Sequence, residues 1–275
     1  MKKNTVLMII LLLVVGVLSA CGDKSSEASK LEKKELILGG TIPYSDMLEK
    51  GVKPYLEEKG YSVTIKEFND YVQPNLALKS GSIDANLYQH EVYMKAFAKE
   101  NNMDLSGVIR VPTAPIGIYS NKYDSLDEIE KGSTVAIAND PTNLARGLTV
   151  LRDNGVIEFD DDVDPLKASV KDITKNPKDL DFKPVEAAQL PRTLDSVDVS
   201  AVNGNFAIAA GMDLNDAIVK DKLPENIINQ VVVNTADKDA QYVKDIEEAV
   251  RSDEFRKVIE EEFQGFHQPE WFKQK

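Results

Sequence analysis

The chain has 275 residues and carries 46 acidic residues against 33 lysines and arginines, a formal net charge of −13. So acidic a surface is repelled by nucleic acids and by anionic lipid heads, and we therefore expect no nucleic-acid partner. The length suffices for one large domain or for two lobes, each with its own core.

The first 34 residues predict a targeted and tethered N-terminus. Residues 1–20 combine two lysines with the apolar run Val6–Leu18, which is too short to span a membrane and is typical of a signal peptide. The run ends in LSAC, which matches a lipobox and predicts lipidation of Cys21, the single cysteine. Residues 21–34 are polar and predict a flexible tether. We expect the protein on the extracytoplasmic face of the cell membrane, held there by lipid.

The first half of the remaining chain alternates strand and helix patterns. Apolar runs that end in glycine or alternate with polar residues indicate strands, and a period near 3.6 indicates helices. This alternation is typical of a parallel α/β sheet. The expected elements are strands at 35–42, 61–68 and 83–88, helices at 45–59, 72–80 and 91–101, and extended chain at 108–120.

The pattern then starts again, with EFNDYVQPNLAL and PVEAAQLPRTL at matching places in the two copies. We interpret this as two α/β lobes of one design, 35–115 with 230–275 and 116–229; the alternative is coincidence between two ordinary βαβ units. The expected elements are strands at 134–138, 182–185, 199–203 and 231–235, helices at 142–154, 191–194 and 241–263, and a break in the last near residue 252.

The stretch 134–148 (TVAIANDPTNLARGL) predicts a buried strand followed directly by a helix. Asp140 suits the N-cap and Pro141 the first helical position. Asn143 and Arg146 are three apart and share a helix face, so an amide and a guanidinium would flank the helix start, where a carboxylate would fit. The alternative is a solvated arginine beside an ordinary cap.

The sequence contains none of the common catalytic motifs. The chain has two histidines and no G-x-S-x-G, H-E-x-x-H, Walker A or G-x-G-x-x-G motif, and we expect no metal or cofactor. Parallel α/β folds bind ligands beyond the carboxyl ends of their strands, and aromatic rings beside amides suit a ligand that is apolar at one end and zwitterionic at the other. His90 could instead be a core or helix-capping histidine. In this chain, the residues at or just after the predicted strand ends are Tyr71, Tyr88, His90, 139–143 and 203–206.

Five motifs, DYVQPNLAL, ANLYQH, VAIANDPTN, EAAQLPR and VNGNFA, together resemble the NlpA/MetQ family of lipid-anchored methionine-binding proteins, which serve methionine ABC importers. The similarity extends from about Leu36 to the C-terminal helices. It implies a two-lobed periplasmic-binding-protein fold, type II-like, with two crossover strands and a mostly parallel sheet in each lobe. The implied partners are methionine and a membrane permease, and we expect a monomer.

The resemblance implies that Tyr71, Tyr88 and His90 enclose the thioether chain of the ligand. Two departures from the family bear on the ligand's length and polarity. Position 88 is tyrosine where many relatives have phenylalanine, and the first loop reads TIPYSDM where relatives often have a histidine.

The resemblance also implies the residues at the polar end of the ligand. Arg146 corresponds to the arginine that pairs with the carboxylate, with Asn143 beside it. Asn203 and Asn205 correspond to the amides that hold the ammonium, and Asn229 to a further amide at the return crossover.

We therefore predict a non-enzymatic receptor for methionine, with the L-isomer favoured. D-methionine, an oxidised form and a methionine-containing dipeptide remain alternatives for the ligand. A surface adhesin with a vestigial pocket is an alternative function, and an enzyme using Tyr71 and His90 as acid-base groups ranks third because no nucleophile is evident.

Overall fold

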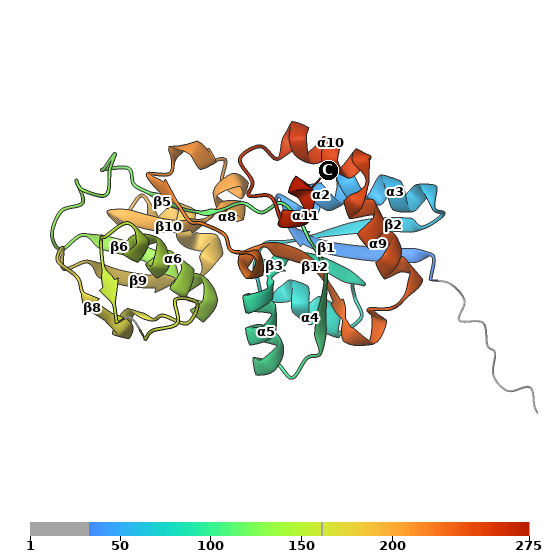
Figure 1. The fold of residues 1–275 in the computed structure, drawn as a ribbon, viewed down its shortest axis with the longest axis horizontal. Helices are drawn as coiled ribbons and strands as arrows, with labels where there is room; N and C mark the ends of the chain where they lie inside the picture. The colour runs from blue at the N-terminus through green and yellow to red at the C-terminus, as the bar shows by residue number, and fades with distance from the viewer. Residues whose placement is uncertain (1–32, 161, 275) are drawn as a thin grey trace, which may run out of the picture. The chain divides into compact units, whose positions relative to one another are not determined.

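Two mixed β-sheets, each with helices packed against it, form the body of the protein (Figure 1). The computed structural model describes residues 33–160 and 162–274. The predicted signal peptide, Cys21 and the tether up to residue 32 lie outside the described residues. Within the described part, no helix is both long and apolar enough to cross a membrane.

The first sheet has five strands in the order β2-β1-β3-β12-β4. β1 pairs in parallel with β2 and β3, whereas β12 runs antiparallel to both β3 and β4. Four strands therefore point one way, and the returning strand β12 points the other. The strands are β1 (Glu35–Thr41), β2 (Ser62–Phe68), β3 (Ala85–His90), β4 (Leu105–Arg110) and β12 (Asn229–Asn234).

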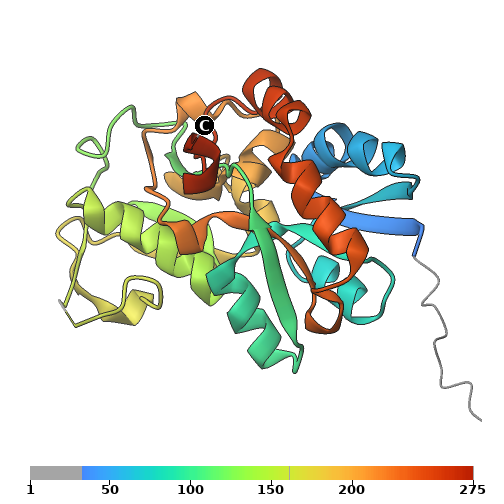
Figure 2. The same cartoon turned by 45° about the vertical axis from the view of Figure 1, so that its right-hand side comes forward.

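Helices from both ends of the chain pack on this sheet around one large apolar core, which includes Leu38, Leu56, Val231 and Phe255. Figure 2 shows the C-terminal helices beside the sheet and its N-terminal helices. The helices around this core are α2 (Tyr44–Met47), the π-helix η1 (Leu48–Val52), α3 (Lys53–Glu58), α9 (Gln241–Arg251), α10 (Asp253–Glu262) and α11 (Glu270–Lys273). Two further helices, α4 (Gln73–Lys79) and α5 (Glu91–Glu100), pack in smaller apolar clusters.

The helix predicted at 45–59 is confirmed as an unbroken helical run over residues 44–58, and the structure adds that its middle part is the π-helix η1, between α2 and α3. Pro54 at the start of α3 has no N–H to donate, which opens the regular ladder one turn earlier. Gly51 in the π-turn also lies so close to Phe255 that a Cβ there would come within 2.7 Å of the ring. The break predicted near residue 252 is confirmed, since Ser252 caps α10 and accepts a hydrogen bond from Phe255 N.

The second sheet also has five strands, in the order β11-β5-β10-β6-β9. β6 is parallel to β10 and β9, and β5 runs antiparallel to β10 and β11. Each sheet thus contains one reversed strand, and in each it is the first strand reached on crossing from the other sheet. The strands are β5 (Ile116–Tyr119), β6 (Thr134–Ala138), β9 (Asp181–Val185), β10 (Val199–Asn203) and β11 (Val219–Lys220).

Helix α6 (Pro141–Asp153) covers one face of the second sheet (Figure 1). Gly147 permits the close approach, because a Cβ there would lie 2.9 Å from the Ile137 side chain. The remaining elements are α7 (Leu190–Thr193), α8 (Gly204–Ala209), the hairpin β7 (Glu158–Phe159) and β8 (Ile173–Lys175), and the 3-10 turns η2 (Val170–Asp172), η3 (Ala187–Gln189), η4 (Leu214–Asp216), η5 (Glu225–Ile227) and η6 (Thr235–Asp237).

Two chain segments connect the sheets, one from β4 to β5 and one from β11 to β12. A third segment lies along the first crossover, because Thr113 and His267 exchange two backbone hydrogen bonds of 2.9 and 2.8 Å. Phe266, the neighbour of His267, packs against the apolar clusters of both sheets. The extended stretch predicted at 108–120 is therefore the end of β4, the first crossover and β5.

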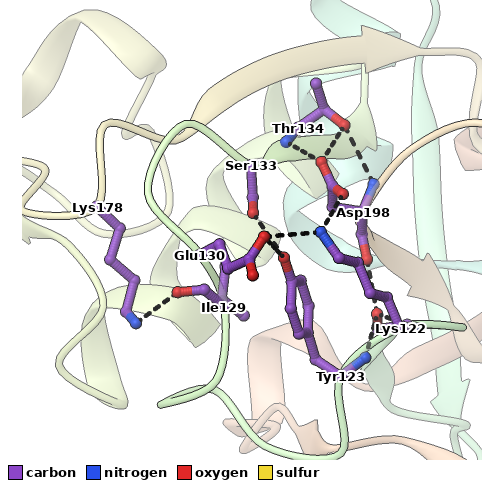
Figure 3. A network of polar contacts seen from close by, with 9 residues as sticks. Lys122, Tyr123, Ile129, Glu130, Ser133, Thr134, Lys178 and Asp198 are labelled. Carbon is purple, nitrogen blue, oxygen red and sulfur yellow. Dashed lines mark hydrogen bonds and ion pairs between the residues drawn. The ribbon is translucent and has the colours of Figure 1, made fainter.

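A polar network fixes the start of the parallel pair β6 and β10 (Figure 3). Asp198 Oδ2 accepts hydrogen bonds from Thr134 N at 2.8 Å and from Thr134 Oγ1 at 2.9 Å. Lys122 Nζ lies 3.4 Å from the other oxygen of Asp198 and 3.0 Å from Glu130. This network therefore sets the register of β6 and β10 at their N-terminal ends. Asn143 and Asn203 lie beyond or at the opposite, C-terminal ends of the same strands.

Candidate functional site

One cavity, here called the inner cavity, lies where the strand ends of both sheets meet. Its enclosed space measures about 20 Å³, roughly room for one water molecule. The structure brings all eight sequence-predicted residues to it: Tyr71, Tyr88, His90, Asn143, Arg146, Asn203, Asn205 and Asn229.

The start of α6 forms one wall, as the sequence predicts. Asp140 is the N-cap and accepts a hydrogen bond from Asn143 N at 3.0 Å, and Pro141 is the first helical residue. Asp140 also holds the Asn143 side chain, whose Nδ2 lies 3.0 and 3.1 Å from its two carboxylate oxygens. The cap therefore orients Asn143 and, through it, the rest of this wall.

Arg146 is buried, with 7% of its surface exposed, and already has an anionic partner. Its Nη2 and Nε donate to Asp221 Oδ2 at 2.7 and 3.2 Å, and its Nη1 donates to Asn143 Oδ1 at 3.1 Å. A guanidinium has five N–H donors, so one on Nη1 and one on Nη2 are left over after these three bonds. Two parallel donors suit a carboxylate oxygen pair.

Asn203 presents an acceptor to the same cavity. Its Nδ2 donates to Asn143 Oδ1 at 2.9 Å, which fixes the orientation of the amide. Its Oδ1 is buried and has no hydrogen-bond partner among residues 33–160 and 162–274. A buried carbonyl oxygen of this kind is costly unless a donor reaches it, and an ammonium group is such a donor.

His90 presents a donor from the opposite wall, at the end of β3. Its Nδ1 accepts a hydrogen bond from Tyr93 N at 3.2 Å, as a capping residue of α5. In the described part of the chain, its buried Nε2 has no partner. Burial, with repulsion from the Arg146 guanidinium, lowers the pKa of His90 well below its usual 6.5. The ring is therefore neutral and carries its proton on Nε2.

Aromatic rings close the apolar side of the cavity. Tyr71 stacks on Tyr88 with ring centroids 5.8 Å apart, and Tyr93 meets both rings edge to face. Tyr71 also contacts the second sheet's side, where its centroid lies 4.8 Å from that of Phe206. Its hydroxyl donates to Asn205 Oδ1 at 2.5 Å, so a hydrogen bond joins the two walls.

A model of the family described as NlpA lipoprotein matches residues 39–271. This chain belongs to the NlpA lipoprotein family. The resemblance inferred from the five sequence motifs is confirmed.

Members of the NlpA family with known names and structures are similar over most of their length. The methionine-binding lipoprotein MetQ of Bacillus subtilis strain 168 is 33% identical over 269 residues, which cover 96% of this chain and 97% of the relative. The D-methionine-binding lipoprotein MetQ of Escherichia coli K12 is 36% identical over 251 residues, with 90% and 91% covered. A nutrient-binding protein from Burkholderia cenocepacia, solved bound to methionine, superposes with a TM-score of 0.80 at 37% identity, over 84% of this chain and 97% of that one. The predicted two-lobed α/β fold is thereby confirmed.

Sequence reasoning missed two residues that shape the inner cavity. Asp221 lies on the return crossover within KDK, a segment whose alternating charges are typical of solvated loops, so no local signal identifies it as the partner of Arg146. Tyr44 follows β1, and the same strand-end rule that selected Tyr88 could have selected it. Its hydroxyl accepts a hydrogen bond from Ala114 N at 3.1 Å, and burial raises its pKa to about 12.

No group of three or more His, Cys, Asp or Glu side chains arranged to hold a metal ion occurs in the described part of the chain. The polar groups that line the inner cavity are instead a guanidinium, amides, phenols, a threonine hydroxyl and a neutral imidazole. This set can bind a zwitterion by hydrogen bonds and enclose an apolar chain between rings.

Proposed function

We propose that this chain is a non-enzymatic receptor that binds methionine, preferably the L-isomer, and delivers it to a membrane ABC permease. The complementary pair of polar groups in the inner cavity carries the proposal. Arg146 has two N–H donors left over that could bind the ligand carboxylate. Asn203 Oδ1 would accept a hydrogen bond from the ligand ammonium. The aromatic rings of Tyr71 and Tyr88 would then face the thioether chain.

The small volume of the inner cavity requires that the site widen to admit an amino acid. We take the lobes as 35–115 with 230–275 and 116–229, joined by the two crossovers. The Tyr71–Asn205 hydrogen bond connects residues of the two lobes. Opening about the crossovers would break this bond, and closing on the ligand would restore it. We further propose that lipidation of Cys21 holds the receptor at the membrane, beside its permease, and that the protein is a monomer.

Isothermal titration calorimetry tests this function with L-methionine, D-methionine, methionine sulfoxide and a methionine-containing dipeptide. In Arg146→Ala, the carboxylate would lose its partner, at a cost of roughly 2 to 5 kcal/mol in binding free energy. Arg152→Ala is the matched control, because Arg152 lies on the same helix and pairs with Asp153 away from the cavity.

The outcomes separate the alternatives. Methionine binding that Arg146→Ala abolishes and Arg152→Ala preserves supports the proposal. Equal affinity in both variants would show that Arg146 does not bind the ligand. If every compound leaves the thermal melt unchanged, the receptor function fails, because a ligand at 100 times its Kd adds about 2.7 kcal/mol to stability.

A further inference from the structure

Tyr93 lies between two cavities. It lines the inner cavity and also a second space of about 300 Å³, here called the outer pocket. The outer pocket lies between α5 and the start of α6, so both lobes contribute to it. Its lining also includes Val72, Ala96, Phe97, Glu100 and Asp140.

The Tyr93 ring is held firmly in this position. Its hydroxyl donates to the Tyr71 backbone oxygen at 2.9 Å. Its ring stacks on Phe97 with centroids 5.9 Å apart and an interplanar angle of 23°. Edge-to-face contacts with Tyr71 and Tyr88 support the ring from the side of the inner cavity. Tyr93 is only 7% exposed and is the one described residue that lines both spaces, so we take its ring as the partition between them.

We propose that Tyr93 determines the length of the side chain that the receptor accepts. This inference rests on the proposed function, in which the ligand carboxylate pairs with Arg146 and the thioether chain runs among the aromatic rings. The inner cavity ends at Tyr93 on that side. A methionine homologue with a larger group on sulfur would have to displace the ring, and the contacts with Phe97 and Tyr71 oppose that displacement.

The lining of the outer pocket indicates which ligands would enter once the partition is removed. Val72 and Phe97 supply apolar surface, and Val72 is 46% exposed. Glu100 and Asp140 add negative charge, which disfavours an anionic extension. The compatible class is therefore neutral thioethers of homocysteine, such as the S-ethyl and S-benzyl compounds.

Calorimetry on the full chain tests the proposal with L-methionine, S-ethyl-L-homocysteine and S-benzyl-L-homocysteine. An oversized apolar group is rejected by about 10- to 200-fold per added methylene, so the wild-type protein should bind the S-benzyl compound at least about 100-fold more weakly than methionine. Tyr93→Ala should reduce this ratio to about 10-fold or less. Tyr93→Phe keeps the ring and loses only the hydroxyl, and it should keep the wild-type ratio.

A second substitution separates an opened outer pocket from general loosening. Ala96 lies one turn after Tyr93 on α5 and lines the outer pocket but not the inner cavity. Adding Ala96→Phe to Tyr93→Ala should fill the opened space and restore the discrimination to about 100-fold. Tyr93→Leu, which leaves less empty space, replaces Tyr93→Ala if circular dichroism shows that the latter is unfolded.

Three results would overturn the inference while leaving methionine binding intact. These are wild-type binding of the S-benzyl compound as tight as that of methionine, an unchanged ratio in folded Tyr93→Ala and Tyr93→Leu, or a double variant that discriminates no better than Tyr93→Ala. Absence of methionine binding in the wild-type protein would instead overturn the proposed function itself.

Discussion

Arg146 and Asp221 form a buried ion pair, with Nη2 2.7 Å from Oδ2 and each side chain 8% exposed. Asp221 lies on the return crossover and also accepts a hydrogen bond from Ile116 N through its other oxygen, at 2.8 Å. The carboxylate thus connects α6, β5 and the crossover. It also directs the guanidinium, so that its remaining donors are available to the inner cavity.

Removal of the Asp221 carboxylate should destabilise the fold. Asp221→Ala leaves Arg146 charged and buried, and we expect the free energy of unfolding to fall by about 3 to 5 kcal/mol. Urea denaturation measures the loss. The control is Asp153→Ala, which breaks a surface pair with Arg152 and should cost about 0 to 1 kcal/mol. Equal losses in the two variants would contradict the structural role assigned to Asp221.

The Tyr71 hydroxyl should slow ligand release, because its hydrogen bond to Asn205 joins the two lobes. A hydrogen bond contributes about 0.5 to 1.5 kcal/mol net, so Tyr71→Phe should raise the dissociation rate of methionine roughly 2- to 12-fold. Stopped-flow competition measures this rate. Tyr55→Phe is the control, since its hydroxyl faces Glu248 on the outer side of the first sheet's helices. If the dissociation rate in Tyr71→Phe equals that of the wild type, this hydrogen bond does not slow ligand release.

The sequence predicts best what depends on neighbouring residues. The small apolar run of β6, the Asp140 cap and the Pro141 start lie within a few positions of one another, and each has one favourable arrangement. Seven of the eight predicted residues lie at or after strand ends or beside the family motifs, whereas Asn229 begins β12 and is predicted only from the family resemblance. Both signals are local in the chain.

What the sequence does not predict depends on distant contacts. Asp221 meets Arg146 across 75 positions, and nothing near it distinguishes it from a solvated acid. The π-turn within the predicted 45–59 helix contains Gly51, which lies against Phe255, about two hundred residues further along the chain. In the sequence, Tyr93 is one residue of the helix predicted at 91–101, with no signal of its own. Its place between two cavities follows only from the packing of α5 against α6.

His90 should make stability depend on pH. In the folded protein its pKa is lowered by burial, whereas in the unfolded chain it titrates near 6.5. Below that pH the unfolded chain binds a proton that the folded protein does not, so stability is complete above about pH 6.5 and is lost as pH falls. As the pH falls from 7.5 to 5.5, this histidine should therefore lower the free energy of unfolding, and urea denaturation at each pH measures the loss.

The variant His90→Gln isolates this contribution. It should flatten the pH dependence of the urea midpoint over the same interval, because the group that titrates in the unfolded chain is gone. A wild-type slope that persists unchanged in His90→Gln would show that His90 is not the group responsible.

A buried amide cluster should hold the aromatic wall in place. Asn75 on α4 is fully buried, and its Oδ1 accepts from Gln89 Nε2 at 2.7 Å and from Asn86 Nδ2 at 3.0 Å. Its Nδ2 donates to Gln89 Oε1 at 2.9 Å. Asn75→Leu leaves Gln89 Oε1 without its donor and takes one acceptor each from Gln89 Nε2 and Asn86 Nδ2, so it should lower the free energy of unfolding by roughly 2 to 4 kcal/mol.

A double-mutant cycle tests whether the cluster acts as a unit. Gln89→Leu removes the partner of Asn75 on β3, so the double variant should lose less stability than the two single variants together. The expected coupling is about 0.5 to 3 kcal/mol in urea denaturation. Additive losses would mean that each amide is satisfied independently. In that case the loop bearing Tyr71 would depend for its position on α4 packing and on the hydroxyls of Tyr88 and Tyr93, both of which donate to the Tyr71 backbone oxygen.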